Sequence, residues 1–497
     1  MRSPPPFRAA PAPFVFFLVG LVFLVYSPAL LNGFVWDDPF LIAGTPAVKG
    51  DAPLWDLWTK PLMLGQEALP FWRPLPLTIH GILARVVGLD ALPFHFFSIA
   101  AHAGVAALLY YWIRGEGVTE LVSFVAAALY AVHPYLTSAV TYVSGVSDPL
   151  AMLFSLVALL AWRSEKNVLA AIAWAAALCF KEWTLMVPVI AAISLTMRGR
   201  KLEAKAIAGA GVVLAVFLFA RWNLFHGMRT SSAMSLTPGE RVLAAVMSLG
   251  FYLPGGLVPW NLRMDRYYDL SEPGFWVWLA LGAAVLIAAA IGFRKFRAHP
   301  ALVAAIPGVG WFALVWFVHS NLPATLNAHV AEHWMYAAYP GLAYAAAMMW
   351  TVLLPKLGPR QRSVALTVVL VIGVAWSGRS FVRQFDWSDE VTLFEANIAA
   401  GADLTRSHLC LAWAYGKKSR YADAAREFEA ALRRSPFHFG ALWGLARAQY
   451  QMQDYDRALV VAAMIHKLYD DHPEVDDFAR VCRERRATAA KAKARSK

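Results

Sequence analysis

The sequence predicts an all-α protein, in which a polytopic helical membrane domain of about 11 spans is followed by a short extracytoplasmic domain of helical repeats. Of its 497 residues, 59% are hydrophobic and only 16% are charged, whereas about a quarter of the residues in soluble globular proteins are charged. The apolar residues gather in runs long enough to cross a bilayer as helices. After Arg379 the composition becomes polar, and similar segments recur at a spacing of 34 residues.

The predicted membrane spans follow the apolar runs. They cover residues 13–31, 92–113, 119–133, 148–162, 167–180, 183–197, 204–220, 274–293, 300–319, 333–354 and 363–378. A further run, 241–259, contains the helix-breaking sequence PGG, and we expect it to form an interfacial or re-entrant helix on the outer side. If this run crossed the membrane, every later loop would change side and the basic segments among them would lie outside.

The charges of the loops predict the sidedness of the chain. With the N-terminus inside, short basic segments such as MRGRKLEAK and GFRKFRAHP become cytoplasmic loops, as the positive-inside rule requires. An odd number of spans then places the C-terminal part on the periplasmic side of a plasma (inner) membrane. The outer face receives the long segments 32–91, 134–147, 221–273 and 320–332. These segments either assemble a site there or merely cap the bundle.

Two segments of the C-terminal region repeat each other, at the period and with the small residues of tetratricopeptide repeats. The matched pairs, each 34 residues apart, are Leu411 with Leu445, Tyr421 with Tyr455, and Ala424 with Ala458. We therefore predict a membrane domain over 1–384, tetratricopeptide-like repeats over 385–484 and a disordered basic tail over 485–497. The repeats either bind a protein partner on a concave face or act as a stabilising cap.

Asp37 and Asp38 stand side by side in NGFVWDDPF, directly after the first span, with Trp36 before them. Neighbouring carboxylates repel, so the pKa of one of them rises if both are partly buried. A carboxylate at this place can act as a general base on an incoming hydroxyl, or help to hold a divalent cation. The alternative is a turn at the helix exit with two solvated acids, and the pair alone favours that alternative.

Three further outer segments carry charged or titratable candidates, each with a structural alternative. Arg73 precedes an amphipathic helix, where it either has an anionic partner or extends to the lipid headgroups. His133 lies at a membrane exit, and Asp148 is either a site residue or the N-cap of the next helix. Lys181 and Glu182 lie at a turn between two spans. They either neutralise each other, or Lys181 offers a cation to a phosphate.

Two later outer segments complete the set of candidates. Arg263 and Arg266 lie in PWNLRMDRYYD, and the planar fork of arginine binds phosphate well. Glu332 and His333 lie at the start of the predicted span 333–354. Together with His329 they have the residue types of a zinc site, but all three come from one short stretch without a fourth ligand, which argues against zinc.

Taken in this order, the motifs resemble the GT-C superfamily of polytopic glycosyltransferases, and more narrowly the transmembrane and tetratricopeptide-repeat O-mannosyltransferases and their bacterial relatives. The matching pieces are NGFVWDD, FWRPL, HPYLTSAVTYVSGVSD, FKEW, PWNLRMDRYYD, AEHWMY and the 34-residue repeats. They cover most of the chain and occur in the order of the family. The short repeat array departs from the animal enzymes, which puts a cadherin-like acceptor in doubt.

The resemblance implies an inverting transfer of a sugar, with mannose as a candidate, from a polyprenyl-phosphate-linked donor to protein Ser/Thr hydroxyls or a glycan. It implies that Asp37 is the base and that Asp38 positions the acceptor, the base or a metal. Whether Mg²⁺ or Mn²⁺ binds at the two aspartates stays open. The candidates to hold the donor phosphate are Arg73, Lys181, Arg263 and Arg266. Further candidates to line the site are Trp36, His133, Asp148, Glu182, Glu332 and His333.

Two other classes of function compete with this interpretation. A non-catalytic, membrane-anchored repeat scaffold would tolerate the loss of the aspartates. A transporter of lipid-linked sugars would need acids within its spans for proton coupling, and the predicted spans contain few. The net charge of +12 reflects basic loops that set the topology, and it does not indicate a nucleic-acid partner.

Overall fold

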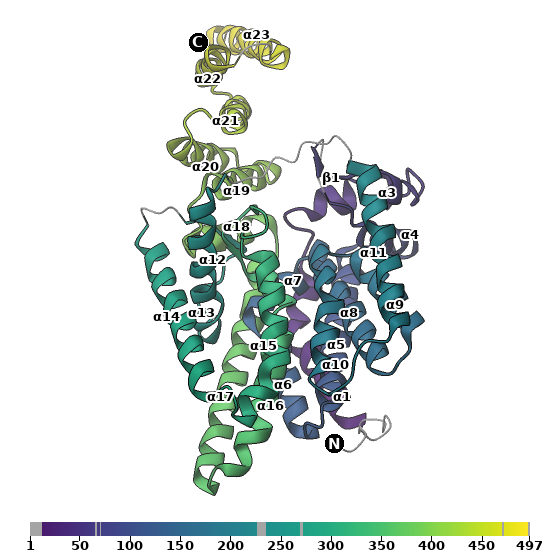
Figure 1. The fold of residues 1–497 in the computed structure, drawn as a ribbon. Coiled ribbons are helices and arrows are strands. Elements are labelled where there is room, and N and C mark those ends of the chain that lie inside the picture. Colours follow the sequence, from purple (N-terminus) through teal and green to yellow (C-terminus); the bar gives the residue numbers. More distant parts are fainter. Residues whose placement is uncertain are drawn as a thin grey trace. The chain divides into compact units, whose positions relative to one another are not determined.

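The computed structural model describes residues 12–64, 67–69, 71–225, 235–268, 272–469 and 472–495. It divides into two compact units, Met1–Ser388 and Asp389–Lys497, and each is considered by itself. Both units are built almost entirely from helices (Figure 1). The all-α prediction is therefore confirmed.

The first unit contains the apolar helices. Its α-helices are α1 (Ala12–Tyr26), α2 (Pro46–Lys49), α3 (Asp56–Thr59), α4 (Pro74–Val87), α5 (Ala91–Arg114), α6 (Glu120–Ala131), α7 (Thr137–Thr141), α8 (Ser147–Arg163), α9 (Asn167–Leu178), α10 (Val187–Thr196), α11 (Ala204–Phe225), α12 (Pro238–Tyr252), α13 (Pro254–Leu257), α14 (Pro273–Phe296), α15 (Pro300–His319), α16 (Tyr339–Leu353) and α17 (Pro359–Arg383). Short 3-10 or π turns join them: η1 (Ser27–Leu31), η2 (Pro39–Ala43), η3 (Pro134–Leu136), η4 (Val143–Val146), η5 (Glu182–Met186), η6 (Glu332–Tyr336), η7 (Leu354–Lys356) and η8 (Gln384–Trp387).

The number of membrane spans differs from the prediction of about 11. Within the described residues, seven helices are long and apolar enough to cross a membrane, or eight if α6 and the bent segment Pro134–Thr141 count as one span. The predicted spans 167–180, 183–197 and 333–354 fold as shorter helices. The 12 residues of α9 extend only about 18 Å at 1.5 Å per residue, against a hydrocarbon core about 30 Å thick. The count is odd at seven spans and even at eight, so it no longer fixes the side on which the C-terminal part lies.

The run 241–259 forms α12 and the short α13. α12 packs along α14 through Gly250 and Gly282, where an added Cβ would overlap the backbone of the other helix. The two helices lie side by side in Figure 1. The contact shows that α12 packs closely along an apolar helix, and the assignment of this run as an interfacial or re-entrant helix stays a prediction.

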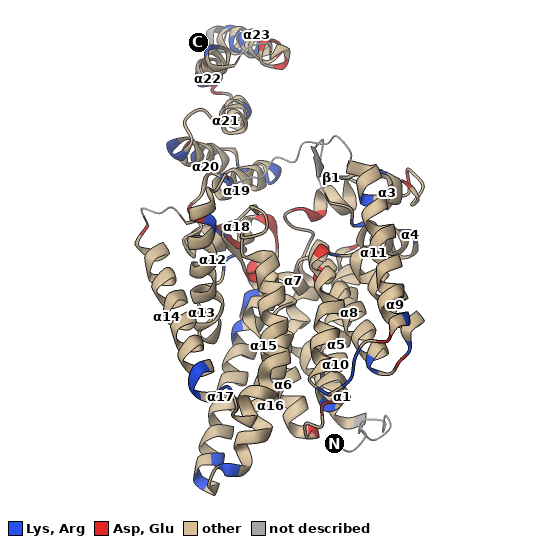
Figure 2. Ribbon diagram, in the orientation of Figure 1, with Lys and Arg blue, Asp and Glu red and all other residues tan. Residues whose placement is uncertain are grey.

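Basic residues mark one end of the membrane unit. In Figure 2 they colour the C-terminal end of α14 and the N-terminal end of α17, near the end of the bundle where α1 begins. The helix α1 leads through η1 away from this end to the aspartate turn. Two short antiparallel pairs lie in the segments predicted to be on the outer side: β1 (Leu62–Leu64) with β2 (Glu67–Leu69), and β3 (Asp265–Arg266) with β4 (Val330–Ala331).

The second unit consists of antiparallel helix pairs. Its helices are α18 (Glu390–Ala399), α19 (Thr405–Lys417), α20 (Tyr421–Arg434), α21 (Phe439–Gln451), α22 (Tyr455–Leu468) and α23 (Pro473–Arg495). The first residues of α19 and α21, and those of α20 and α22, lie 34 positions apart, as the predicted repeats require. The expected disorder of the basic tail is wrong for its described part, because α23 continues through Arg495.

Candidate functional site

The two aspartates lie in a turn after η1 and have different surroundings. Trp36, directly before them, has a φ of 60°, which is rare for a bulky residue and typical of strained backbone at functional sites. The turn buries Asp38 completely and leaves Asp37 half-buried. Asp37 interacts with the hydroxyl of Tyr142. Two residues that look equivalent in the sequence are therefore different in the structure.

Asp38 accepts hydrogen bonds from protein donors with both carboxylate oxygens. Oδ1 accepts from the backbone N–H of Ser144 at 2.8 Å and from its hydroxyl at 2.6 Å. Oδ2 accepts from the backbone N–H of Val35 at 3.2 Å. Burial raises the pKa of Asp38 to about 7, although the bonds from Ser144 and Val35 oppose the rise. Asp38 thus fastens the turn to η4, and Asp37 is the acid of the pair with exposed surface.

Three aromatic rings stack beside the aspartates. The rings of Trp36 and Tyr142 lie 5.2 Å apart between centroids at an interplanar angle of 28°. Tyr142 in turn stacks on Trp387 at 6.0 Å and 30°. Trp387 belongs to η8, at the end of the last apolar helix and about 350 residues beyond Trp36 in the sequence. Through Tyr142, Trp36 therefore joins the aspartate turn to the end of the membrane unit.

Backbone and side-chain hydrogen bonds attach the same C-terminal segment to the aspartate turn. The side chain of Asn32 donates to the carbonyl of Gln384 at 3.0 Å, and the N–H of Gly33 donates to the carbonyl of Ser388 at 3.0 Å. Thr141 donates to the side chain of Gln384. Sequence reasoning missed this contribution, because nothing in the local pattern of QFDWS indicates a partner so distant in the sequence.

A first charged group, the Arg73–Lys181 cluster, contains these two cations with Asp148, Glu182 and Arg221. Lys181 Nζ lies 2.7 Å from Asp148 Oδ2, and both side chains are largely buried. Arg73 binds Glu182 through Nη2 at 2.7 Å and Nε at 3.2 Å, and Arg221 lies 3.7 Å from the same carboxylate. Burial lowers the pKa of Lys181, and Asp148 opposes that shift. Three cations here face two carboxylates, which leaves an excess of positive charge.

The segment from η4 to the first turn of α8 joins this cluster to the aspartates. Ser144 binds Asp38, and Asp148, four residues later, binds Lys181. The expected role of Asp148 as an N-cap is wrong, because the cap position of α8 is Val146. The charges of FKEW do not neutralise each other either, since each pairs with a residue from another segment.

An apolar cavity of about 310 Å³ opens beside Arg73. Its wall comes from the first outer segment and includes Phe40, Pro46, Leu57, Trp72 and Leu77 together with Arg73. Phe40 is three residues beyond Asp37, so the cavity begins next to the aspartate turn. Asp56 and Lys60 also line it. A mostly apolar wall with an arginine at its edge has the chemistry to bind an amphiphile that carries an anion.

A second charged group, the Arg266–Glu332 cluster, contains these two residues with Arg263 and Arg383. The β3–β4 pairing holds Arg266 opposite Val330, so that its Nη1 lies 3.4 Å from Glu332 Oε1. The backbone N–H of Arg263 donates to the same oxygen at 2.5 Å. Burial raises the pKa of Glu332, and the charges of Arg383 and Arg266 oppose the rise. Sequence reasoning did not select Arg383, because its charge acts on Glu332, 51 positions earlier in the sequence, and nothing in the local pattern indicates that partner.

The four predicted phosphate ligands thus divide between two clusters: Arg73 and Lys181 belong to the first, and Arg263 and Arg266 to the second. Glu332 and His333 are adjacent yet point apart: Glu332 binds Arg266, whereas the charges of Lys181 and Arg73 act on His333. Burial lowers the pKa of His333 well below its usual value.

His133 has a structural place at the bend after α6. Its Nε2 lies 3.0 Å from the carbonyl of Gly256, and its ring packs against Tyr339 and Trp376. It joins the bend to α13 and is not part of either charged cluster.

The two aspartates do not offer the ligands that a divalent cation needs. Mg²⁺ takes six oxygen ligands in near-octahedral geometry, whereas both oxygens of Asp38 already accept bonds from Ser144 and Val35. In the part of the chain that the structure describes, no three His, Cys, Asp or Glu side chains are grouped as metal ligands. We therefore derive no step through Mg²⁺ or Mn²⁺.

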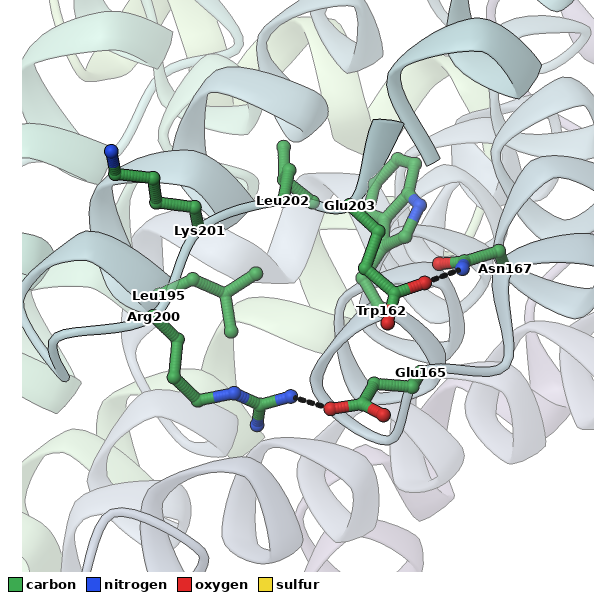
Figure 3. A pocket seen from close by; sticks show the side chains of 8 residues that line it. All are labelled: Trp162, Glu165, Asn167, Leu195, Arg200, Lys201, Leu202 and Glu203. Atoms are coloured by element: carbon green, nitrogen blue, oxygen red, sulfur yellow. Dashed lines mark hydrogen bonds and ion pairs between the residues drawn. The ribbon is translucent and has the colours of Figure 1, made fainter. Parts of the chain in front are cut away.

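Another cavity, of about 200 Å³, lies at the far end of α8 (Figure 3). Ion pairs and hydrogen bonds cross it, from Arg200 to Glu165 and from Asn167 to Glu203. Trp162 in its wall is 14 residues along α8 from Asp148, or about 21 Å at 1.5 Å per residue. This distance separates the cavity from the candidate site.

The comparisons with known proteins agree with the resemblance seen in the sequence. A tetratricopeptide repeat family model matches residues 410–473. The human protein O-mannosyl-transferase TMTC1 is 32% identical over 164 residues, which are 31% of this chain and 18% of that protein. The Caenorhabditis elegans protein O-mannosyl-transferase F38B6.6 is 20% identical over 445 residues, which are 84% of this chain and 62% of that protein. The chain thus spans less than two thirds of the length of these relatives.

A comparison of structures gives ArnT from Cupriavidus metallidurans bound to undecaprenyl phosphate. The TM-score is 0.40 at 15% identity, with 94% of this chain and 82% of the other chain covered. The tetratricopeptide prediction is confirmed by the family model, and the similarity to O-mannosyltransferases is confirmed by the named relatives.

Proposed function

We propose that this protein is an inverting membrane glycosyltransferase that transfers a sugar, with mannose as the first candidate, from a polyprenyl-phosphate donor to hydroxyls of an extracytoplasmic acceptor, Ser or Thr of a protein. The observation that carries the proposal is the division of roles between Asp37 and Asp38. One acid is fixed by three hydrogen bonds and the other keeps exposed surface next to an apolar cavity with a cationic edge. The names of the relatives support the reaction class.

In the proposed reaction, the acceptor hydroxyl attacks the anomeric carbon of the sugar from the side opposite the phosphate. The new C–O bond forms as the bond from the anomeric carbon to the phosphate oxygen breaks, so the configuration inverts. Asp37 takes the proton of the hydroxyl as general base. Asp38 holds the turn, and with it Asp37, in position through Ser144. The polyprenyl phosphate leaves as an anion with its bonding electrons.

The Arg73–Lys181 cluster is the better candidate to hold the donor phosphate. Arg73 also lines the apolar cavity, so one residue touches both the place for a prenyl chain and the place for its anionic head. Lys181, which is largely buried, and Arg221, which is partly exposed, add positive charge. Around a buried cation, electrostatic stabilisation of a leaving group is stronger than in water. Arg263 and Arg266, which belong to the other cluster, are weaker candidates.

The proposed sidedness rests on the distribution of charge. Basic residues lie at the end of the unit where α1 begins (Figure 2), and the positive-inside rule assigns that end to the cytoplasm. The aspartate turn then faces the periplasm. A cysteine-labelling reporter at Asp51, in the same outer segment, tests this: labelling from outside in intact spheroplasts agrees, and labelling only after lysis contradicts it.

The activity itself is tested with the purified full-length chain, a labelled polyprenyl-phosphate mannose and a Ser/Thr peptide. We expect Asp37→Asn to lose about 10²–10⁴-fold in rate, the contribution of a general base. Asp51→Asn is the matched control, because Asp51 lies in the same segment, is largely exposed and pairs with the exposed Lys49. Full activity of Asp37→Asn would remove the assigned base. Movement of the labelled lipid across liposomes without modification of any acceptor would instead favour a transporter.

A further inference from the structure

Arg383 is among the largest fully buried side chains of the molecule, although it is charged. It ends α17, the last apolar helix, and its Nη1 donates to Asp386 Oδ2 at 2.8 Å. Its guanidinium lies over the ring of Trp387, 5.9 Å from the centroid. Its Nη2 is buried and has no hydrogen-bond partner among the described residues. A buried donor that lacks an acceptor costs about 1–3 kcal/mol, so this atom requires an explanation.

The neighbours of Arg383 do not provide the missing acceptor. The carboxylate of Glu332 is close enough for its charge to act on Arg383, but its Oε1 already accepts from Arg263 and Arg266. Asp386 is partly exposed and binds the other nitrogen. Arg379, one turn earlier on the same helix, adds a further positive charge, and it donates to the carbonyl of Trp260. Positive charge therefore accumulates around an N–H group that lacks an acceptor.

The position of Arg383 relates it to the aspartate turn. The next residue, Gln384, accepts from Asn32, and Trp387 stacks on Tyr142, which also touches Trp36. Arg383 thus contacts Trp387, the last ring of the aromatic stack, and it belongs to the Arg266–Glu332 cluster and not to the Arg73–Lys181 cluster. Arg383 is thereby connected, through Trp387 and Tyr142, to the turn that carries Asp37.

We propose that Arg383 is the centre of a second anion-binding site, which binds a carboxylate of the acceptor through its Nη2 and the neighbouring arginines of the Arg266–Glu332 cluster. The inference rests on the proposed function, since it names the chemical class of the acceptor: a hydroxyl-bearing peptide with an acidic residue near the Ser or Thr. Arginine suits this role because its fork matches a carboxylate in two parallel hydrogen bonds.

The test measures binding without donor, so that its outcome does not depend on transfer. Two fluorescent Ser/Thr peptides, identical except for Glu or Gln beside the hydroxyl residue, are titrated against the purified full-length chain. We expect the wild type to bind the Glu peptide about ten- to a hundredfold more tightly, the effect of one charge-assisted hydrogen bond. Arg383→Gln should abolish this preference and leave the Kd of the Gln peptide unchanged. Arg360→Gln, an exposed arginine at the other end of α17, is the control and should keep the preference.

A second variant guards against a simple loss of folding. Asp386→Asn removes the carboxylate that now occupies Arg383 Nη1, and we expect it to bind the Glu peptide severalfold more tightly than the wild type. Equal binding of both peptides to the wild type, or an unchanged preference in Arg383→Gln, would overturn the proposal. If Arg383→Gln instead weakens the binding of undecaprenyl phosphate, the site belongs to the donor and the assignment to the acceptor is wrong. The proposed function fails separately, through an active Asp37→Asn.

Discussion

Replacing Asp38 by asparagine is the most direct test of the aspartate turn. The carboxylate accepts three hydrogen bonds, two at Oδ1 from Ser144 and one at Oδ2 from the N–H of Val35. An amide keeps one acceptor oxygen and places an NH₂ group where the other oxygen was, so that it faces a backbone N–H. Leaving one buried donor without an acceptor costs about 1–3 kcal/mol. We expect Asp38→Asn to lose that much stability when Asp38 is neutral in the wild type.

The difference in stability between the wild type and Asp38→Asn depends on pH. The pKa of Asp38 is about 7 in the folded protein, against an ordinary value of 3.8. Between these values the folded state holds a proton that the unfolded state has lost, so stability falls as the pH rises from about 4 to about 7 and is constant above. Three pKa units at 1.36 kcal/mol each amount to about 4 kcal/mol. Asparagine does not titrate, so the advantage of the wild type at pH 5 should shrink or reverse at pH 8.

The assay is the apparent Tm of the detergent-solubilised full-length chain at pH 5 and at pH 8. Other buried groups titrate in both proteins, so the quantity of interest is the difference between wild type and Asp38→Asn at each pH. Asp51→Asn, an exposed acid of the same segment, should follow the wild type. A difference between wild type and Asp38→Asn that is the same at both pH values would refute the burial of an ionisable Asp38. Equal stability of the wild type and Asp38→Asn at pH 5 would contradict the hydrogen bonds that Asp38 accepts from Ser144 and Val35.

Two further substitutions test the packing and the donor site. Gly282→Ala should separate α12 from α14, because the added Cβ would overlap the backbone of Val246, and should lower the free energy of unfolding by about 1–3 kcal/mol. Gly292→Ala, on the same helix but with open space around it, should leave the Tm unchanged in the same thermal assay. Asp148→Asn removes the partner of Lys181 and should lower the free energy of unfolding by about 3–5 kcal/mol. Added undecaprenyl phosphate should raise the Tm of this variant more than that of the wild type. A smaller rise in the variant would contradict phosphate binding at Lys181.

The repeat unit was the most predictable part of the fold. The period of 34 residues and the small residues at matched positions are local properties, and the helix pairs α19–α20 and α21–α22 follow from them directly. The membrane unit was predictable in class but not in span count. A hydrophobic segment is expected to avoid water, but its hydrophobicity does not show whether lipid or the interior of a helix bundle surrounds it. For this reason the short helix α9 was predicted to be a membrane span.

The candidate site was predictable as a list of residues and not as a set of contacts. Charged residues in apolar surroundings are conspicuous, so Asp37, Lys181 and Arg266 could be selected from the sequence alone. Their partners could not, because Lys181 binds an acid 33 positions away and Arg266 one 66 positions away. Arg383 and Gln384 were missed for the same reason, because each interacts with a residue more than 50 positions away: the charge of Arg383 acts on Glu332, and the carbonyl of Gln384 accepts from Asn32.

The structure also changes the argument about the two aspartates. From the sequence, two adjacent acids could be assigned roles only by analogy, since like charges at one turn share the same neighbours along the chain. The asymmetry comes from Ser144, which occupies Asp38 from another segment and leaves Asp37 as the acid with exposed surface. Because Asp148 on the same short segment binds Lys181, a displacement of this segment would disturb Asp37, the proposed base, and the Arg73–Lys181 cluster, the proposed phosphate site, together. We therefore expect substitutions at Ser144 to lower the rate of transfer and the affinity for donor in parallel, whereas a role for Ser144 confined to the base would change the rate alone.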